Sequence, residues 1–156
     1  MYIIPIMIYL MGANNSLNRY KRFHLSSRLD TITFMQCLHE VFTLFEDLCS
    51  LAVYMQRKCK RRENNKKNQL WIDIRNHIKH DIREEFDKED SKKKKGREER
   101  LGVDSYLQMN LECKKNYIKV GSTIVSIKEI EDYLHKEKLF IDIVYKEAKA
   151  KGFINK

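Results

Sequence analysis

Proline and glycine are scarce in this sequence, with one proline and five glycines in 156 residues. Sandwiches and barrels built from short strands need many tight turns, and these two residues supply most of them. The scarcity therefore argues against an all-β fold and favours long helices. A chain of this length corresponds to about one domain, and we expect a single domain over residues 1–156.

Cysteine pairs of the kind that bind zinc are also missing. The four cysteines are Cys37, Cys49, Cys59 and Cys113, and none of them forms a C-x-x-C pair or has histidine at zinc-finger spacing. We interpret them as free thiols in a reducing cytoplasm. The sequence contains no glycine-rich phosphate loop and no nucleophile elbow, so no cofactor and no bound metal are expected.

The sequence also lacks an apolar run long enough to cross a membrane. Its most apolar segment, Met1–Met11, is shorter than the ~20 residues that a span needs. This segment has neither the basic start nor the small-residue cleavage site of a signal peptide. We expect a short strand or a packed arm within residues 1–25, one or two helical turns over residues 16–28, and no membrane partner. A biological start at Met7 or Met11 is an alternative.

Charge is abundant and mostly positive. The chain has 31 lysines and arginines against 22 acidic residues, which gives a formal net charge of +9. This balance favours an anionic partner, which is either a nucleic acid or an acidic protein or membrane surface. Two runs, 57–67 and 90–100, are especially basic. Each fits a solvated surface as well as a binding site, and the second belongs to a flexible basic loop that we expect over residues 89–104.

Three stretches have apolar residues at the three- and four-residue spacings of a core-facing helix. The first runs over residues 30–60, with Asp30 as its expected N-cap. The second runs over residues 69–87 and is expected to be capped by Asn68. The third covers residues 127–151. We expect these three helices to be antiparallel neighbours, with the N-terminal segment completing the bundle.

The third helix is marked at both ends. Ser126-Ile127-Lys128-Glu129 is a capping box at its start, and Gly152 is a suitable stop. A polar interruption at residues 135–138 can kink or split it. Before it, residues 105–125 alternate between apolar and polar, which predicts a β-hairpin whose second strand bends at Gly121. The expected fold is therefore mainly α: a four-helix up-and-down-type bundle with a small β-hairpin before the C-terminal helix.

The second helix contains a local contradiction. On a helical wheel, Arg75 falls within the apolar stripe of this helix, which is formed by Trp71, Ile78, Ile82 and Phe86. A guanidinium cannot be deprotonated and is costly to bury unpaired. Arg75 therefore needs a carboxylate, a phosphate or a subunit boundary beside it, and such contradictions are expected at functional sites.

A purely structural explanation is also open. Arg75 can pair with a carboxylate at the edge of the core on the preceding helix, and the candidates there are Glu40, Glu46 and Asp47. In that case His80 is an ordinary exposed helical histidine.

The segment Arg75-Asn76-His77-Ile78-Lys79-His80 resembles the R-x(4–6)-H motif of the HEPN superfamily (higher eukaryotes and prokaryotes nucleotide-binding), with Asn76 in the polar slot. The resemblance covers roughly residues 25–90. It implies a small helical domain that cleaves RNA without a metal, with two copies of the motif facing one cleft in a dimer. It also implies a toxin or host-defence role with a cognate antitoxin protein. Some family members carry a modifiable tyrosine two residues after the histidine, and here that residue is Ile82, which puts such control in doubt.

The residue types suit RNA cleavage in which the ribose 2′-OH is the nucleophile. We expect His80 to act as acid or base, Arg75 to clamp the phosphate and Asn76 to orient either of them. Arg75 and His80 lie five residues apart, so they point about 140° from each other on an ideal helix. A two-fold homodimer would supply the second Arg and His that such a site needs.

The basic residues around this helix are candidates for sequence-independent phosphate contacts with RNA. They are Lys58, Lys60, Arg61, Arg62, Lys66, Lys67, Lys79, Lys92, Lys93, Lys94 and Lys95. Two alternatives to the endoribonuclease remain open. One is a non-catalytic HEPN-like module that binds RNA, a nucleotide or a partner protein, and the other is a helical scaffold protein.

Overall fold

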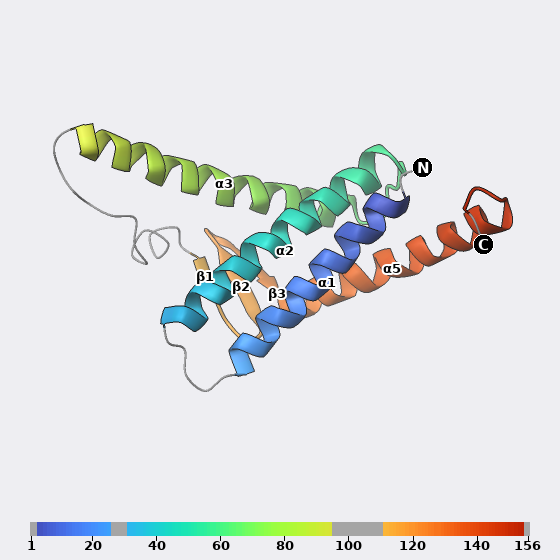
Figure 1. Cartoon of the computed structure of the whole chain (residues 1–156), viewed down its shortest axis with the longest axis horizontal. Helices are drawn as coiled ribbons and strands as arrows, with labels where there is room; N and C mark the ends of the chain where they lie inside the picture. Colours follow the sequence, from blue (N-terminus) through green and yellow to red (C-terminus); the bar gives the residue numbers. More distant parts are fainter. Residues whose placement is uncertain (1–2, 26–30, 95–110, 155–156) are drawn as a thin grey trace.

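The computed structural model describes residues 3–25, 31–94 and 111–154, with side chains described except at 24, 25, 31 and 81–94 (Figure 1). Within these ranges the protein is mainly helical. Its elements, in chain order, are α1 Ile3–Leu25, α2 Thr31–Arg57, α3 Asn65–Lys94, β1 Leu111–Cys113, β2 Tyr117–Val120, β3 Thr123–Ser126 and α5 Ile127–Ala150. The expected Asp30 cap, residues 95–104 of the predicted loop and the strand residues before 111 lie outside the described residues. Residues 89–94 of that predicted loop are part of α3, so the helix is longer than predicted and this part of the loop prediction is wrong.

The N-terminal segment is a helix rather than the predicted strand or arm. α1 spans 23 residues, and a stripe of alternating three- and four-residue spacing enters the core at Ile3, Ile6, Leu10, Ala13 and Leu17. Pro5 lies in the first turn, where its missing N–H leaves no intrahelical bond unmade. Burial of this stripe outweighs the strand preference of the isoleucines, so a long helix replaces both the expected arm and the short helical turns.

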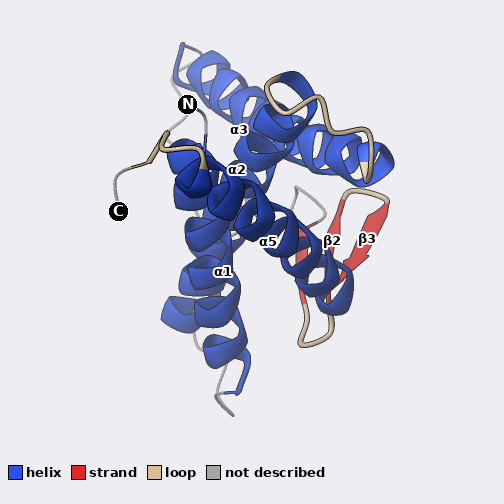
Figure 2. Ribbon diagram, turned by 90° about the vertical axis from the view of Figure 1, so that its right-hand side faces the viewer, coloured by secondary structure: helices blue, strands red, loops and turns tan. Residues whose placement is uncertain are grey.

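α2 is central to the helical part of the fold. It packs against α1 on one side and against α3 on the other, and α5 packs against α1 (Figures 1 and 2). Trp71 of α3 is fully buried, with its ring 6.2 Å from that of Phe45 on α2 and 5.4 Å from that of Tyr133 on α5. This aromatic group fixes the depth at which α3 packs, and therefore where its exposed face begins.

The predicted hairpin is a three-stranded antiparallel sheet in the order β1-β2-β3. β1 pairs with β2 from Leu111 opposite Val120, and β2 pairs with β3 from Tyr117 opposite Ser126. The bend expected at Gly121 is a full turn that divides the predicted second strand into two. Gly121 has a φ of +61°, a conformation that glycine adopts without steric cost.

α5 begins and ends as the sequence predicts. The Ser126 hydroxyl accepts a bond from the Glu129 N–H, and the Glu129 carboxylate accepts one from the Ser126 N–H, which completes the capping box. Gly152 follows the helix with a φ of +75°. The polar segment 135–138 does not split the helix, which is continuous there, and Glu137 is buried within it.

Candidate functional site

α3 presents the Arg75-Asn76 pair and His80 along its outer surface. Ile74 and Ile78 are buried like Trp71, whereas Asn76 and His80 are exposed and Arg75 is intermediate, with 26% of its side chain accessible. The helix begins at Asn65 rather than after Asn68, and Asn68 is buried inside it, where its side chain accepts a bond from the Tyr133 hydroxyl. The expected Asn68 cap is therefore wrong.

Arg75 is held by a carboxylate of the preceding helix. Its Nε donates to one oxygen of Glu46 at 2.9 Å and its Nη2 to the other at 3.0 Å, a bidentate pair. Its Nη1 donates to the side-chain oxygen of Asn76 at 3.3 Å. Of the three carboxylates that the sequence offered, Glu46 is the partner, as the structural explanation allowed.

The electrostatics around Glu46 favour full ionisation of this pair. The hydrogen bond from Arg75 lowers the pKa of Glu46, and the charges of Arg75 and Lys79 lower it further. The same bond raises the pKa of Arg75. The Lys79 ammonium lies 3.9 Å from a Glu46 oxygen. The single negative charge of Glu46 lies near two positive charges, those of Arg75 and Lys79. The surface patch formed by these three residues therefore keeps a net positive charge.

Among the residues that the structure describes, Arg75 retains two N–H groups beyond these bonds. A guanidinium carries five N–H donors in a planar fork. Glu46 takes the Nε/Nη2 edge and Asn76 takes one Nη1 donor. One donor on Nη1 and one on Nη2 remain, and these two can bind a phosphate. Pairing with Glu46 and binding an anion are therefore compatible.

The structure brings Arg75 and Asn76 into contact, while His80 lies five residues further along the helix. His77 is exposed and lies beside the turn between β2 and β3. A Cβ added to Gly121 would come within 2.8 Å of the His77 Nε2. The small sheet thus contacts α3 within the motif itself.

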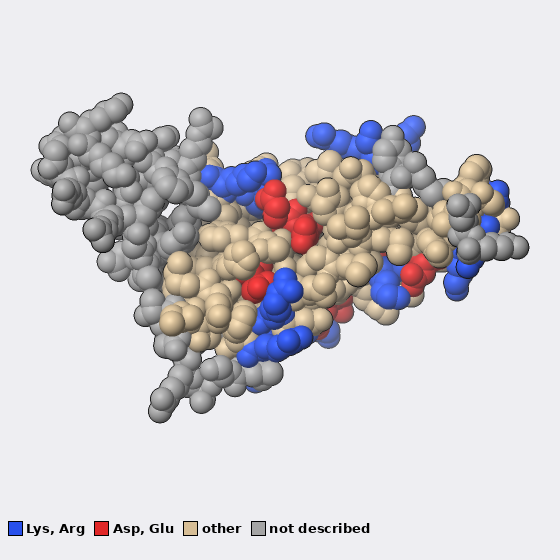
Figure 3. All heavy atoms as spheres, viewed as in Figure 1, with Lys and Arg blue, Asp and Glu red and all other residues tan. Residues whose placement is uncertain are grey.

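Apart from Arg61, the basic residues predicted to contact RNA fall into three groups. Those with exposed side chains are Lys58, Lys60, Arg62, Lys66 and Lys79. Lys67 pairs with Glu129 at 2.9 Å. Lys92, Lys93 and Lys94 belong to α3 with side chains outside the described set, and Lys95 lies outside the described residues. On the face shown in Figure 3, Lys and Arg atoms form separate groups, several with acidic atoms beside them.

Arg61 belongs to a different environment. Its side chain is only 10% exposed and its Nη1 donates to the buried carboxylate of Glu137 at 3.1 Å. Asn64 donates to the other Glu137 oxygen at 2.8 Å, and the guanidinium lies 4.2 Å from the centre of the Phe140 ring. Desolvation raises the pKa of Glu137. Arg61 therefore joins the α2–α3 connection to α5, and we leave it out of the RNA-contacting set.

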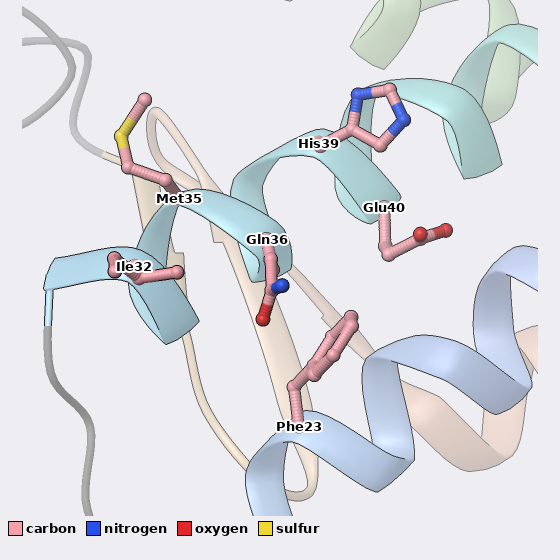
Figure 4. A pocket seen from close by; sticks show the side chains of 6 residues that line it. All are labelled: Phe23, Ile32, Met35, Gln36, His39 and Glu40. Carbon is pink, nitrogen blue, oxygen red and sulfur yellow. The ribbon is translucent and has the colours of Figure 1, made fainter.

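Sequence reasoning also missed a cavity of about 450 Å³ between the end of α1 and the start of α2 (Figure 4). Glu40, at its edge, is 5% exposed and accepts a bond from the Arg19 Nε at 2.9 Å. This pairing explains why Glu40 is not the partner of Arg75. The remaining lining residues are Phe23, Ile32, Met35, Gln36 and His39.

Two further observations concern the described part of the chain. It contains no group of three or more His, Cys, Asp or Glu side chains that could hold a metal ion. None of its helices is long and apolar enough to cross a membrane.

No family model, curated protein or solved structure matches the chain.

Proposed function

We propose that this chain is a HEPN-like, metal-independent endoribonuclease whose reacting groups are Arg75, Asn76 and His80 of α3. One observation carries the proposal: Arg75 is fixed at the surface by Glu46 with two guanidinium donors left over, directly beside Asn76. A preorganised cation with spare donors is what stabilises charge that develops on a phosphate during cleavage.

The chemistry follows from the residue types. The ribose 2′-OH attacks the adjacent phosphorus and gives its proton to a base, the bond from phosphorus to the 5′-oxygen breaks, and that oxygen receives a proton. The products are a cyclic phosphate and a 5′-hydroxyl end. His80 can serve as the base or as the acid near neutral pH, and Arg75 offsets the charge on the non-bridging oxygens. Glu46 acts as a positioning residue, since it touches Arg75 rather than RNA.

A complete site needs two proton-transferring groups, and among the proposed reacting groups Arg75, Asn76 and His80 of one α3 helix only His80 can transfer protons. We therefore propose a two-fold homodimer in which two copies of α3 face each other, which brings a second Arg75 and His80 to one cleft. Such an interface should bury more than about 1,000 Å² in total. Light scattering at high micromolar concentration should give the mass of a dimer, and a monomer there would contradict this arrangement.

The decisive assay incubates purified protein with single-stranded RNA in EDTA. The parent should cleave, and activity should fall as salt rises because phosphate contacts weaken steeply with ionic strength. His80→Ala should abolish cleavage while leaving RNA binding largely intact. His135→Ala, which removes an exposed histidine from α5, is the matched control and should cleave like the parent. If the parent leaves every RNA intact, or if His80→Ala cleaves as well as the parent, the enzyme proposal is wrong.

A second candidate is a non-catalytic HEPN-like module that binds RNA or a partner. The observation that favours it is the bidentate Glu46–Arg75 pair, which is also what a purely structural arginine would make. The two candidates differ in the effect of breaking this pair. For an enzyme, Arg75→Ala lowers cleavage far more than Glu46→Ala, because only Arg75 touches the phosphate. For a binding module, both variants lose similar stability and neither has cleavage to lose.

A further inference from the structure

A second cavity, of about 570 Å³, lies where α1, the turn between β1 and β2, and the start of α5 meet. Its volume is within the usual range for small-ligand sites. It is lined by Lys21, Lys115, Asn116, Ser126, Ile127, Lys128 and Glu131. Three lysines from three separate elements therefore converge on one hollow, and none of them belongs to the basic runs or to the α3 motif.

The ion pairs around this cavity leave it positively charged. Glu131 is paired with Lys21, and nearby Glu129 is paired with Lys67. Within the part of the chain that the structure describes, no carboxylate pairs with Lys115 or Lys128, whose side chains are exposed. Two ammonium groups therefore remain uncompensated beside one small cavity, and the Asn116 amide adds hydrogen-bond donors.

We propose that this cavity binds a phosphate monoester. Lys115 and Lys128 hold the phosphate, and the part of the cavity between these lysines and Ile127 accommodates the attached organic group. The charge decides the class of ligand. A monoester carries nearly two negative charges at neutral pH, which matches the two ammonium groups, whereas a phosphodiester carries one. Lysine binds phosphate as a point charge and needs no particular fork geometry. Ile127 and the lysine stems give the wall an apolar part.

The cavity is separate from the Arg75 site. It lies at the end of β2 and β3 that holds Asn116 and Ser126, whereas His77 of α3 lies beside Gly121 at the other end. Strands of four residues span about 13 Å. Binding here does not depend on the ribonuclease activity proposed above, and the two can be tested apart.

Calorimetric titration of the full-length protein with three matched ligands tests the proposal. AMP is a monoester, 3′,5′-cyclic AMP is the corresponding diester and adenosine has no phosphate. We expect AMP to bind, with adenosine and the cyclic diester at least about tenfold weaker. AMP affinity should also fall as the pH drops below the second phosphate pKa, which is about 6.

Four variants locate the binding. Lys115→Gln and Lys128→Gln should each weaken AMP binding about tenfold, the effect of losing one charged hydrogen-bond donor. Glu131→Gln should tighten it several-fold, because it removes the repelling carboxylate and releases Lys21. Lys146→Gln, at an exposed lysine further along α5, changes the net charge equally and should leave affinity unchanged.

Two RNA oligonucleotides identify the natural source of the phosphate. If a 5′-phosphorylated RNA competes with AMP and its 5′-hydroxyl counterpart does not, the ligand is an RNA end. If neither competes, the ligand is a free small phosphate. Equal binding of AMP and adenosine, equal binding of AMP and the cyclic diester, or an equal loss in Lys146→Gln would each overturn the proposal. Lys115→Gln and Lys128→Gln should still cleave 5′-hydroxyl RNA at the parent rate, so failure here is distinguishable from failure of the ribonuclease proposal.

Discussion

Replacing Arg61 with methionine should destabilise the protein strongly, although the residue lies in a basic run that suggests a solvated surface. The Arg61 side chain is 10% exposed and that of Glu137 is 1% exposed. The substitution leaves the Glu137 carboxylate buried without its cation. Removing one partner of a buried pair costs about 3–5 kcal/mol.

The structure sets the expected value near the lower end of that range. Asn64 still donates to one Glu137 oxygen, and the Arg61 Nε makes no hydrogen bond within the described part of the chain. Methionine also keeps part of the apolar contact with Phe140. We therefore expect a loss of about 3 kcal/mol, which lowers the urea midpoint by about 1.5 M at a typical slope.

The loss should depend on pH. Burial raises the pKa of Glu137 in the folded protein. The contribution of Glu137 to the free energy of unfolding is therefore fully present below its unfolded-state pKa and is lost as the pH rises through its folded-state pKa. Without Arg61 the folded pKa rises further, and the deficit of Arg61→Met should grow from acidic to neutral pH. Urea unfolding followed by circular dichroism at several pH values measures it.

Two companion variants make the result decisive. Arg62→Met, at the exposed neighbour, should change stability by no more than about 0.5 kcal/mol. The double variant Arg61→Met/Glu137→Leu should recover most of the loss, because an apolar pair of similar volume can replace a buried ion pair. A loss below about 1 kcal/mol for Arg61→Met, or no recovery in the double variant, would refute a buried ion pair between α5 and the α2–α3 connection.

Three further outcomes can be checked on the purified protein. Gly121→Ala should lower the unfolding free energy by about 1–3 kcal/mol in urea titrations, because the residue has positive φ and the new methyl group meets His77; an unchanged midpoint would contradict this contact. Ser126→Ala should cost about 1 kcal/mol by thermal unfolding, since it removes the bond to the Glu129 N–H, and Ser126→Asp should restore most of it. Burial raises the pKa of Cys113 to about 12, so this thiol should react with a maleimide far more slowly at pH 8 in native than in urea-unfolded protein, and equal rates would show that it is accessible.

The parts of the fold that could be predicted are those encoded by local patterns. The apolar spacing of α2, the capping box at Ser126 and the positive-φ stop at Gly152 each depend on a few neighbouring residues. The sequence pattern does not predict α1 although the helical spacing is present, because isoleucines and a proline near its start resemble a strand or an arm. A single glycine permits either a bend or a full turn, so the pattern does not predict the β2–β3 turn.

The candidate site was predictable only in outline. The wheel showed that Arg75 needs a partner, but choosing Glu46 over Glu40 requires knowing that Arg19 already binds Glu40. Burial of Glu137 was beyond local reasoning, since its partners Arg61 and Asn64 lie 76 and 73 residues away in the chain. Polar residues that are buried by partners far away in the chain look like surface residues when only a short stretch of sequence is considered.

The order in which the elements meet has a consequence for folding. α1 packs on α2, α2 packs on α3, and each strand pairs with the next, so most packing joins neighbours along the chain. Longer-range contacts join α3 to α5 and α1 to the sheet and α5. Those of α1 span the most sequence, with Tyr20 bonded to the Lys114 carbonyl and Lys21 to Glu131 across about a hundred residues. Closing that loop carries the largest entropic cost, so we expect it to form late. The lysine-lined cavity exists only after α1 has packed against the sheet and α5. A ligand bound in this cavity would therefore slow unfolding, because it would stabilise the contact that forms last.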